Sequence, residues 1–101
     1  MDFRSLLRSL LRTRPRRRPL RIELYTRAGC HLCEQVGEQL RAAQGSYALD
    51  LHVIDVDRVD ELVYRYGDWV PVIVVEGKER FRGRVNAVLL DRLLRKESSR
   101  F

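Results

Sequence analysis

Residues 20–33 read LRIELYTRAGCHLC, and this stretch sets the architecture of the chain. Its first six residues alternate apolar and polar side chains, which is the pattern of a half-buried strand. A four-residue loop follows, and then Leu32, Val36 and Leu40 recur at every fourth position, which predicts a helix over 30–44. A strand therefore turns into a helix whose first residue is a cysteine.

The rest of the chain continues this alternation of strands and helices. The further elements that its patterns predict are a strand over 49–56, a short helix capped by Asp57, a strand over 70–75 with Pro71 near its start, a tight turn at 76–78, a partner strand over 79–82 and a last helix capped by Asn86 that frays from Ser98. The order β-α-β-α-β-β-α predicts an α/β fold, a four-stranded mixed sheet with helices on both faces. The first two strands must run parallel through a right-handed crossover.

Positive charge is concentrated at the start of the chain. The 101 residues carry 20 Lys and Arg against 14 Asp and Glu, a net charge of +6. Residues 1–21 hold eight arginines and one acid, so this segment carries +7 and the rest of the chain carries −1. A basic chain normally suggests nucleic acid, but here the charge belongs to one segment. We therefore divide the chain into a basic, amphipathic or disordered N-terminal extension over 1–19 and a domain over 20–97.

Length, hydropathy and cysteine count exclude several classes of protein. A chain of 101 residues fits one domain, and no apolar run approaches the roughly 18 residues needed to span a bilayer. Two cysteines cannot build a disulfide-rich scaffold or a four-cysteine zinc site. Residues 1–19 do not have the continuous apolar core of a secretory signal, so we expect the protein to be cytoplasmic.

The two cysteines form a Cys-X-X-Cys motif with helical spacing. Residues three apart lie on the same side of a helix, so the sulfurs of Cys30 and Cys33 can reach bonding distance. The free amides at the helix start stabilise a thiolate on Cys30, and nearby Arg27 and protonated His31 add positive charge that lowers its pKa. We therefore expect a redox-active disulfide, in which Cys30 attacks a substrate disulfide and Cys33 resolves the mixed disulfide.

Two other interpretations of the motif stay open, namely half of a metal site and a pair of structural cysteines. A zinc site needs about four ligands, and beyond the two cysteines the chain offers only His31 and His52 as further candidates. We therefore predict no metal site. A Cys-X-X-Cys motif at a strand-to-helix junction within a βαβ pattern favours the redox interpretation.

Two stretches of the sequence together resemble a known family. They are LYTRAGCHLC at residues 24–33 and WVPV at residues 69–72. With the order of the elements, they look like a glutaredoxin-like member of the thioredoxin superfamily, over residues 22–96. The resemblance implies a thioredoxin-like fold and the activity of a small thiol-disulfide oxidoreductase.

The resemblance also implies roles for individual residues. In that family the proline matching Pro71 is cis and faces the dithiol, and the backbone of the residue before it, here Val70, binds an extended substrate or glutathione. Arg27 stands where the family commonly has a lysine that binds the glycine carboxylate of glutathione. Gly83 matches one glycine of a pair that binds the amino end of glutathione. Trp69 is either part of the substrate groove or an aromatic residue of the core or surface. The candidate substrate-binding residues are thus Arg27, His31, Trp69, Val70, Pro71 and Gly83.

These observations predict an enzyme that reduces protein or glutathione mixed disulfides. We expect no tightly bound cofactor, glutathione as a co-substrate, glutathione or a thioredoxin-type protein as reductant, and a monomer. One alternative is a module in which two chains share an iron–sulfur cluster through Cys30 and glutathione. Another is that residues 1–19 bind a membrane, another anionic surface or nucleic acid while the domain is a redox-inert scaffold.

Overall fold

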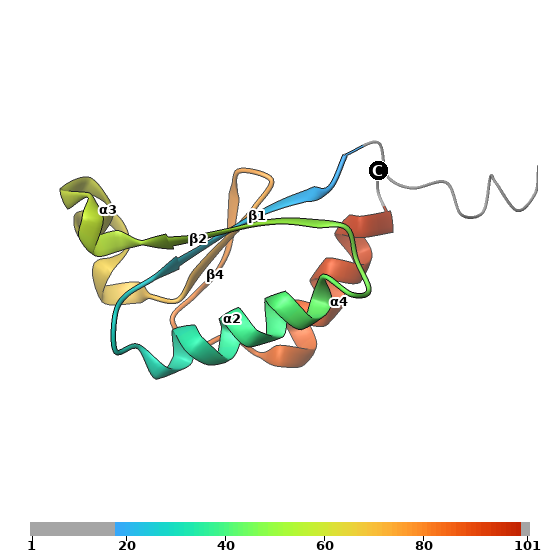
Figure 1. Ribbon diagram of the computed structural model, residues 1–101, viewed down its shortest axis with the longest axis horizontal. Coiled ribbons are helices and arrows are strands. Elements are labelled where there is room, and N and C mark those ends of the chain that lie inside the picture. The colour runs from blue at the N-terminus through green and yellow to red at the C-terminus, as the bar shows by residue number, and fades with distance from the viewer. Residues whose placement is uncertain (1–17, 100–101) are drawn as a thin grey trace, which may run out of the picture.

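The computed structural model describes residues 18–99 (Figure 1). The strands are β1 (Leu20–Thr26), β2 (Leu49–Asp55), β3 (Val72–Val75) and β4 (Lys78–Arg82), and the helices are α2 (His31–Ala43), α3 (Asp60–Tyr66) and α4 (Ala87–Ser99). Short 3-10 turns at Val56–Arg58 and Gly67–Trp69 flank α3. The predicted extension over 1–19 lies outside the described residues except for its last two positions. No helix within residues 18–99 has the length and hydropathy to cross a membrane.

The four strands form one mixed sheet in the order β2-β1-β3-β4. β1 pairs with β2 in parallel and with β3 antiparallel, and β3 pairs antiparallel with β4, which confirms the predicted α/β fold. β3 begins two residues later than predicted, because Pro71 has no N–H to contribute to a ladder. Tyr25 is paired with Val72, so the loop after β1 and the segment before β3 lie at the same end of the sheet.

The two faces of the sheet are covered by different helices. α2 and α4 lie on the same side of the sheet (Figure 1), whereas α3 packs through Tyr66 against the other face. The larger core cluster joins β1 and β3 to α2 and α4, and its buried residues are Leu20, Ile22, Leu24, Val36, Leu40, Ile73, Val75, Leu90, Leu93 and Leu94. Each such side chain stabilises the fold by about 1.5–3 kcal/mol when fully buried. Because Leu24 and Val36 are both anchored in this cluster, the β1–α2 loop between them is held at both ends.

The turn after β2 differs from the prediction. Asp57 does not cap α3; instead, the Asp55 side chain accepts a hydrogen bond from the Asp57 N–H at 3.0 Å. α3 begins at Asp60, and no side chain caps it. The Asp57 carboxylate is bound by the distant Arg27, a contact that no local pattern in the sequence indicates.

The last helix begins as predicted and ends later than predicted. Asn86 caps α4, because its Oδ1 accepts hydrogen bonds from the N–H groups of Val88 at 2.9 Å and Leu89 at 3.1 Å. The helix continues through Ser99, beyond the predicted start of fraying at Ser98. The leucine stripe of α4 contributes Leu90, Leu93 and Leu94 to the larger cluster, which stabilises the helix along its length.

Candidate active site

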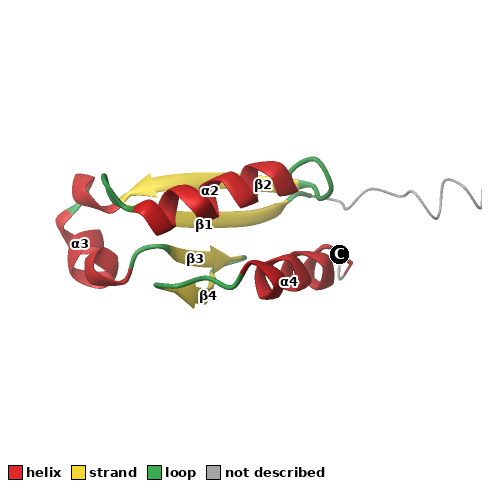
Figure 2. Cartoon of the chain, turned by 90° about the horizontal axis from the view of Figure 1, so that it is seen from below, coloured by secondary structure: helices red, strands yellow, loops and turns green. Residues whose placement is uncertain are grey.

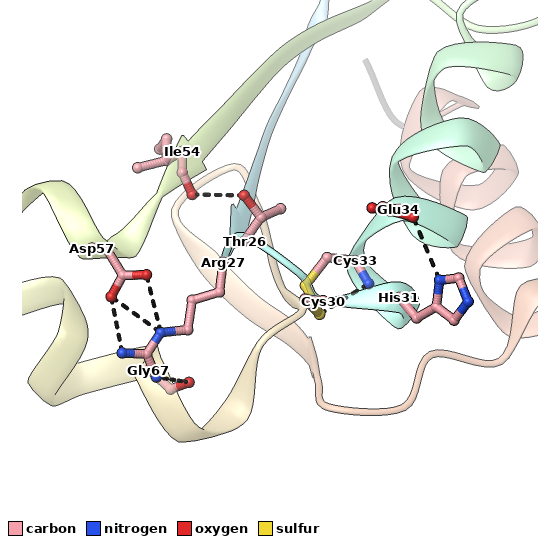
Figure 3. The surroundings of a disulfide bond; sticks show 9 residues. All are labelled: Thr26, Arg27, Cys30, His31, Cys33, Glu34, Ile54, Asp57 and Gly67. Carbon is pink, nitrogen blue, oxygen red and sulfur yellow. Dashed lines mark hydrogen bonds and ion pairs between the residues drawn. A yellow bond between two sulfur atoms is a disulfide. The ribbon is translucent and has the colours of Figure 1, made fainter.

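A disulfide bond joins Cys30 and Cys33 at the start of α2 (Figure 3). Cys30 is the N-cap residue: its backbone is extended, and its sulfur accepts a hydrogen bond from the Cys33 N–H at 3.2 Å. The two Cα atoms lie 5.2 Å apart, within the usual range for a disulfide. The structure thus brings together the two cysteines that the sequence predicts as a pair.

The two bonded cysteines differ in burial. Cys33 lies inside the first turn of α2 and is only 4% exposed, whereas Cys30 is partly exposed at the helix start. An approaching molecule therefore reaches Cys30 more easily than Cys33. This asymmetry is what attack by one sulfur and resolution by the other would require.

The segment before β3 lies at the same end of the sheet as the disulfide. Its Val70–Pro71 peptide bond is cis, as the resemblance implies. Gly83 holds this segment, because its N–H is shared between the carbonyl oxygens of Trp69 at 2.6 Å and Pro71 at 2.9 Å. The φ angle of Gly83 is 72°, in the left-handed region that favours glycine. Gly83 therefore positions the residues around the cis bond, a role that the sequence did not indicate.

Trp69 is a surface aromatic residue rather than a core residue. Its side chain is half exposed, at 51%, and the guanidinium of Arg82 lies over its ring, 5.2 Å from the ring centroid. Glu79 holds Arg82 in place through two hydrogen bonds of 2.8 and 2.7 Å. These hydrogen bonds lower the pKa of Glu79 and raise the pKa of Arg82. A fixed guanidinium thus covers one face of an indole next to the cis bond.

Arg27 is bound by two other parts of the chain. Its Nε and Nη2 donate to the Asp57 carboxylate over distances of 2.9 to 3.2 Å, and its Nη1 donates to the Gly67 carbonyl at 3.2 Å. The hydrogen bonds with Asp57 raise the pKa of Arg27. The resemblance implies that Arg27 binds a carboxylate of glutathione. In the structure, Arg27 instead binds the carboxylate of Asp57.

His31 lies on the outside of the first turn of α2. Its side chain is 93% exposed, and its Nδ1 is 3.5 Å from Oε2 of Glu34. In Figure 3 its ring is turned toward Glu34 and away from the sulfur atoms. The predicted effect of His31 on the Cys30 thiolate stays a prediction.

His52, the other histidine considered as a metal ligand, lies on β2. Its Nε2 is 3.0 Å from Asp50 and 3.2 Å from Arg21, so its neighbours are residues of the sheet surface. In the part of the chain that the structure describes, no three His, Cys, Asp or Glu side chains gather in a way that could hold a metal ion.

A cavity of about 280 Å³ adjoins the disulfide, on the side of the site toward β2. Both cysteines and Arg27 line it, together with Val53 of β2 and Gly37 of α2. Sequence reasoning missed this cavity and the two partners of Arg27. One signal was present for Asp57: the parallel strands β1 and β2 end at the same edge of the sheet, so the residues after them are neighbours.

Tyr25, near the end of β1, is a core residue. It is 8% exposed, its hydroxyl donates to Glu23 at 2.8 Å, and its ring centroid lies 4.5 Å from that of Tyr66. Burial, and after it the contact with Glu23, raises the pKa of Tyr25 to about 12. Tyr25 therefore stays protonated near neutral pH and packs against Tyr66 of α3.

The sequence matches the model of a protein family described as Glutaredoxin-like domain (DUF836), over residues 21–95. Uncharacterized proteins of Mycobacterium bovis and Mycobacterium tuberculosis are 38% identical to it over 64 residues. That match covers 58% of this chain and 66% of each relative, so the chain spans slightly less than two-thirds of the length of these relatives.

Solved structures agree with the family match. A protein from Nitrosomonas europaea is 32% identical, with a TM-score of 0.65 over 78% of this chain and 95% of that chain. A thioredoxin variant from Halobacterium salinarum has a TM-score of 0.63 at 19% identity, over 80% of this chain and 76% of that chain. The oxidised thioredoxin of Plasmodium falciparum has a TM-score of 0.61 at 19% identity, over 93% and 91%. The two thioredoxins show the fold alone, which is thioredoxin-like. From the match over residues 21–95 we conclude that the chain belongs to the glutaredoxin-like domain family.

Proposed function

We propose that this protein is a dithiol-disulfide oxidoreductase in which Cys30 attacks and Cys33 resolves. The observation that carries the proposal is the placement of the bonded pair. Cys30 caps the first turn of α2 and is partly exposed, while Cys33 is buried within bonding distance of it. Membership of the glutaredoxin-like family supports the same activity.

The reaction balances between the two cysteines and one substrate disulfide, R–S–S–R′. The Cys30 thiolate attacks one substrate sulfur, forms Cys30–S–S–R and releases R′–S⁻. The Cys33 thiolate then attacks the Cys30 sulfur, releases R–S⁻ and closes the Cys30–Cys33 bond. The substrate gains two electrons, the dithiol loses two, and the two cysteine protons end on the released thiols.

The start of α2 supplies the stabilisation that the attacking thiolate needs. The Cys33 N–H already points at the Cys30 sulfur, at 3.2 Å, and the helix dipole favours negative charge at the same place. Arg27 adds less positive charge here than the sequence suggested, because Asp57 neutralises it. The backbone at the start of α2 therefore contacts the sulfur directly, whereas the neighbouring cation is paired with Asp57.

We further propose protein or small-molecule disulfides as substrates, with glutathione or a thioredoxin-type protein returning the pair to the dithiol. Trp69, Val70 and Pro71 lie at the same end of the sheet as the disulfide, and the backbone of Val70 is a candidate docking edge for an extended substrate. The proposal includes a monomer without a tightly bound cofactor. The reducing cytoplasm is the compartment in which such a dithiol would cycle.

A single-turnover measurement tests the proposal. Prereduced protein, freed of reductant, is mixed with bis(2-hydroxyethyl) disulfide, and the released thiol and the intact protein mass are followed. We expect two thiols released per protein and a final mass that is two hydrogens lower. Protein alkylated at both cysteines is the control. If the prereduced protein releases no more thiol than this control, the proposed function is wrong.

A further inference from the structure

Arg27 lies three residues before Cys30 and is held from two sides (Figure 3). Asp57, in the turn after β2, accepts from both Nε and Nη2, while the Gly67 carbonyl, after α3, accepts from Nη1. A guanidinium bound to a carboxylate through two nitrogens is the geometry in which arginine also recognises carboxylate ligands. In this protein, the carboxylate of Asp57 takes the place that a ligand carboxylate would occupy on Arg27.

Gly67 makes room for the arrangement. A Cβ atom at this position would lie 3.3 Å from Nη1 of Arg27 and 3.3 Å from the side chain of Val63. Contacts this close require Arg27 or Val63 to shift slightly, so glycine is the residue that leaves the guanidinium undisturbed. The two segments that flank α3 therefore both contact Arg27, which lies 30 and 40 residues before them in the sequence.

Arg27 also lines the cavity of about 280 Å³ that adjoins both cysteines. The other charged residues of its lining are Glu34, Glu38 and Arg41. Asp57 balances the charge of Arg27. The remaining charged side chains of the lining are therefore the two carboxylates of Glu34 and Glu38 and the guanidinium of Arg41. The charged side chains of the lining would therefore repel a negatively charged substrate arm that enters the cavity.

We propose that Asp57 occupies Arg27 as an internal carboxylate and thereby selects against disulfides with carboxylate-bearing arms. This inference rests on the proposed function and names its substrate class: disulfides whose arms are uncharged or cationic near the sulfur. Glutathione carries two carboxylates and falls into the disfavoured class, which favours a protein as the electron donor. Asp57 acts through Arg27 and is a specificity-determining residue rather than a catalytic one.

Three small disulfides test the inference: dithiodipropionate, bis(2-hydroxyethyl) disulfide and cystamine, which carry a carboxylate, a hydroxyl or an ammonium group on each arm. Prereduced full-length protein reduces each one in a single turnover by the exchange written above. Each rate constant is divided by that of dithiothreitol with the same disulfide, which removes differences in intrinsic reactivity. We expect the normalised rate for dithiodipropionate to be about threefold below that for the hydroxyl compound, because repulsion across a wet cavity is modest.

The variant Asp57→Asn releases Arg27 from its internal carboxylate. We expect the ratio of the carboxylate rate to the hydroxyl rate to rise about tenfold, because a freed guanidinium gains a charge-assisted hydrogen bond to the substrate. Adding Arg27→Gln should remove this gain. Asp91→Asn is the matched control, because it breaks the Asp91–Arg95 pair of 3.1 Å on α4, and it should leave the ratio unchanged. Partial unfolding lowers both rates equally and leaves the ratio intact.

The outcomes separate the two proposals. A wild-type protein that prefers the carboxylate disulfide overturns the inference, and so does an Asp57→Asn variant with an unchanged ratio. If the ratio stays raised after Arg27→Gln is added, the inference is also overturned, because the loss of the negative charge of Asp57 would then explain the rise without Arg27. Reduction of none of the three disulfides overturns the proposed function instead.

Discussion

Figure 2 shows the helices α2 and α4. Each is 13 residues long and contributes to the same core cluster, but side chains of different chemistry cap their first turns. At the start of α4 an amide oxygen of Asn86 accepts two backbone hydrogen bonds of 2.9 and 3.1 Å. At the start of α2 the sulfur of Cys30 accepts one, at 3.2 Å. Sulfur is a weak acceptor, so α2 begins with the poorer cap.

The two N-cap residues, Asn86 and Cys30, serve different purposes: one stabilises the fold, and the other takes part in the proposed reaction. Asparagine is among the preferred N-cap residues, and its role at α4 is to satisfy free amides. Cysteine satisfies them less well while it is a disulfide, but a thiolate at the same place is stabilised by those amides. The start of α4 therefore contributes mainly to the free energy of folding, and the start of α2 contributes mainly to the proposed reaction.

The largest expected effect is the loss of reaction in Cys30→Ser. Serine lacks a usable nucleophile at neutral pH, so we expect the rate of bis(2-hydroxyethyl) disulfide reduction to fall by more than about a thousandfold. Serine is nevertheless a good N-cap residue, so the melting temperature should stay close to that of the reduced wild type. A variant that keeps its reaction rate would contradict the role of Cys30.

Cys33→Ser should stop the reaction halfway. The first step needs only Cys30, so we expect one thiol released per protein and a mixed disulfide retained on Cys30. Intact-mass measurement detects the added hydroxyethylthio group. Release of two thiols without an adduct would show that resolution does not depend on Cys33.

Asn86→Ala should affect folding and not the reaction. We expect a loss of about 1 kcal/mol in the free energy of unfolding, equivalent to roughly 4–8 °C in the melting temperature of a domain of this size. Thermal and urea denaturation measure this loss, and Asn86→Asp, which keeps a capping oxygen, is the control. An unchanged melting temperature would show that the cap contributes little.

Gly37→Ala should produce a smaller change of the opposite sign. α2 has a glycine near its middle, whereas α4 has none, and alanine is favoured over glycine by up to about 1 kcal/mol in a helix. The added Cβ would lie 3.2 Å from Nη1 of Arg41, the far end of a side chain that can move. We expect a gain of about 0.5 kcal/mol in urea denaturation. A loss would show that Arg41 cannot give way.

The strand before α2 carries a titrating group whose effect is confined to alkaline pH. Tyr25 has a pKa of about 12, raised by burial, against about 10 in the unfolded chain. Below pH 10 both states hold the proton, but between pH 10 and 12 only the unfolded state releases it, so the free energy of unfolding falls. Tyr25→Phe should show a shallower fall in alkaline urea denaturation. Equal slopes would mean that Tyr25 titrates normally.

Features carried by neighbouring residues could be predicted from the sequence. The spacing of Cys30 and Cys33, their position at a strand-to-helix junction and the cap at Asn86 all lie within a few residues, and local backbone geometry sets them. The cis bond before Pro71 was implied by the resemblance and is present. The order of the elements was also sufficient to predict the mixed sheet.

The surroundings of the disulfide could not be predicted in this way. Arg27 meets Asp57 and Gly67 across sequence separations of 30 and 40 residues, and Gly83 meets the backbone around Pro71 only because β4 returns beside β3. The residues that follow Asp57 have the pattern of a helix, so the local sequence predicts that Asp57 caps that helix. The true partner of Asp57 became adjacent only when β1 and β2 paired in parallel.

The amino-acid sequence thus established the fold class and the reactive pair, because periodicity and short-range spacing determine both. Assembly of the strands established which charges surround that pair. The sequence predicts that Arg27 binds a substrate carboxylate, but in the folded protein Arg27 is paired with Asp57. The parallel register of β1 and β2 brings Nη2 of Arg27 to 2.9 Å from Oδ1 of Asp57. Contacts of this kind depend on the relative position of whole strands, and no local pattern encodes them.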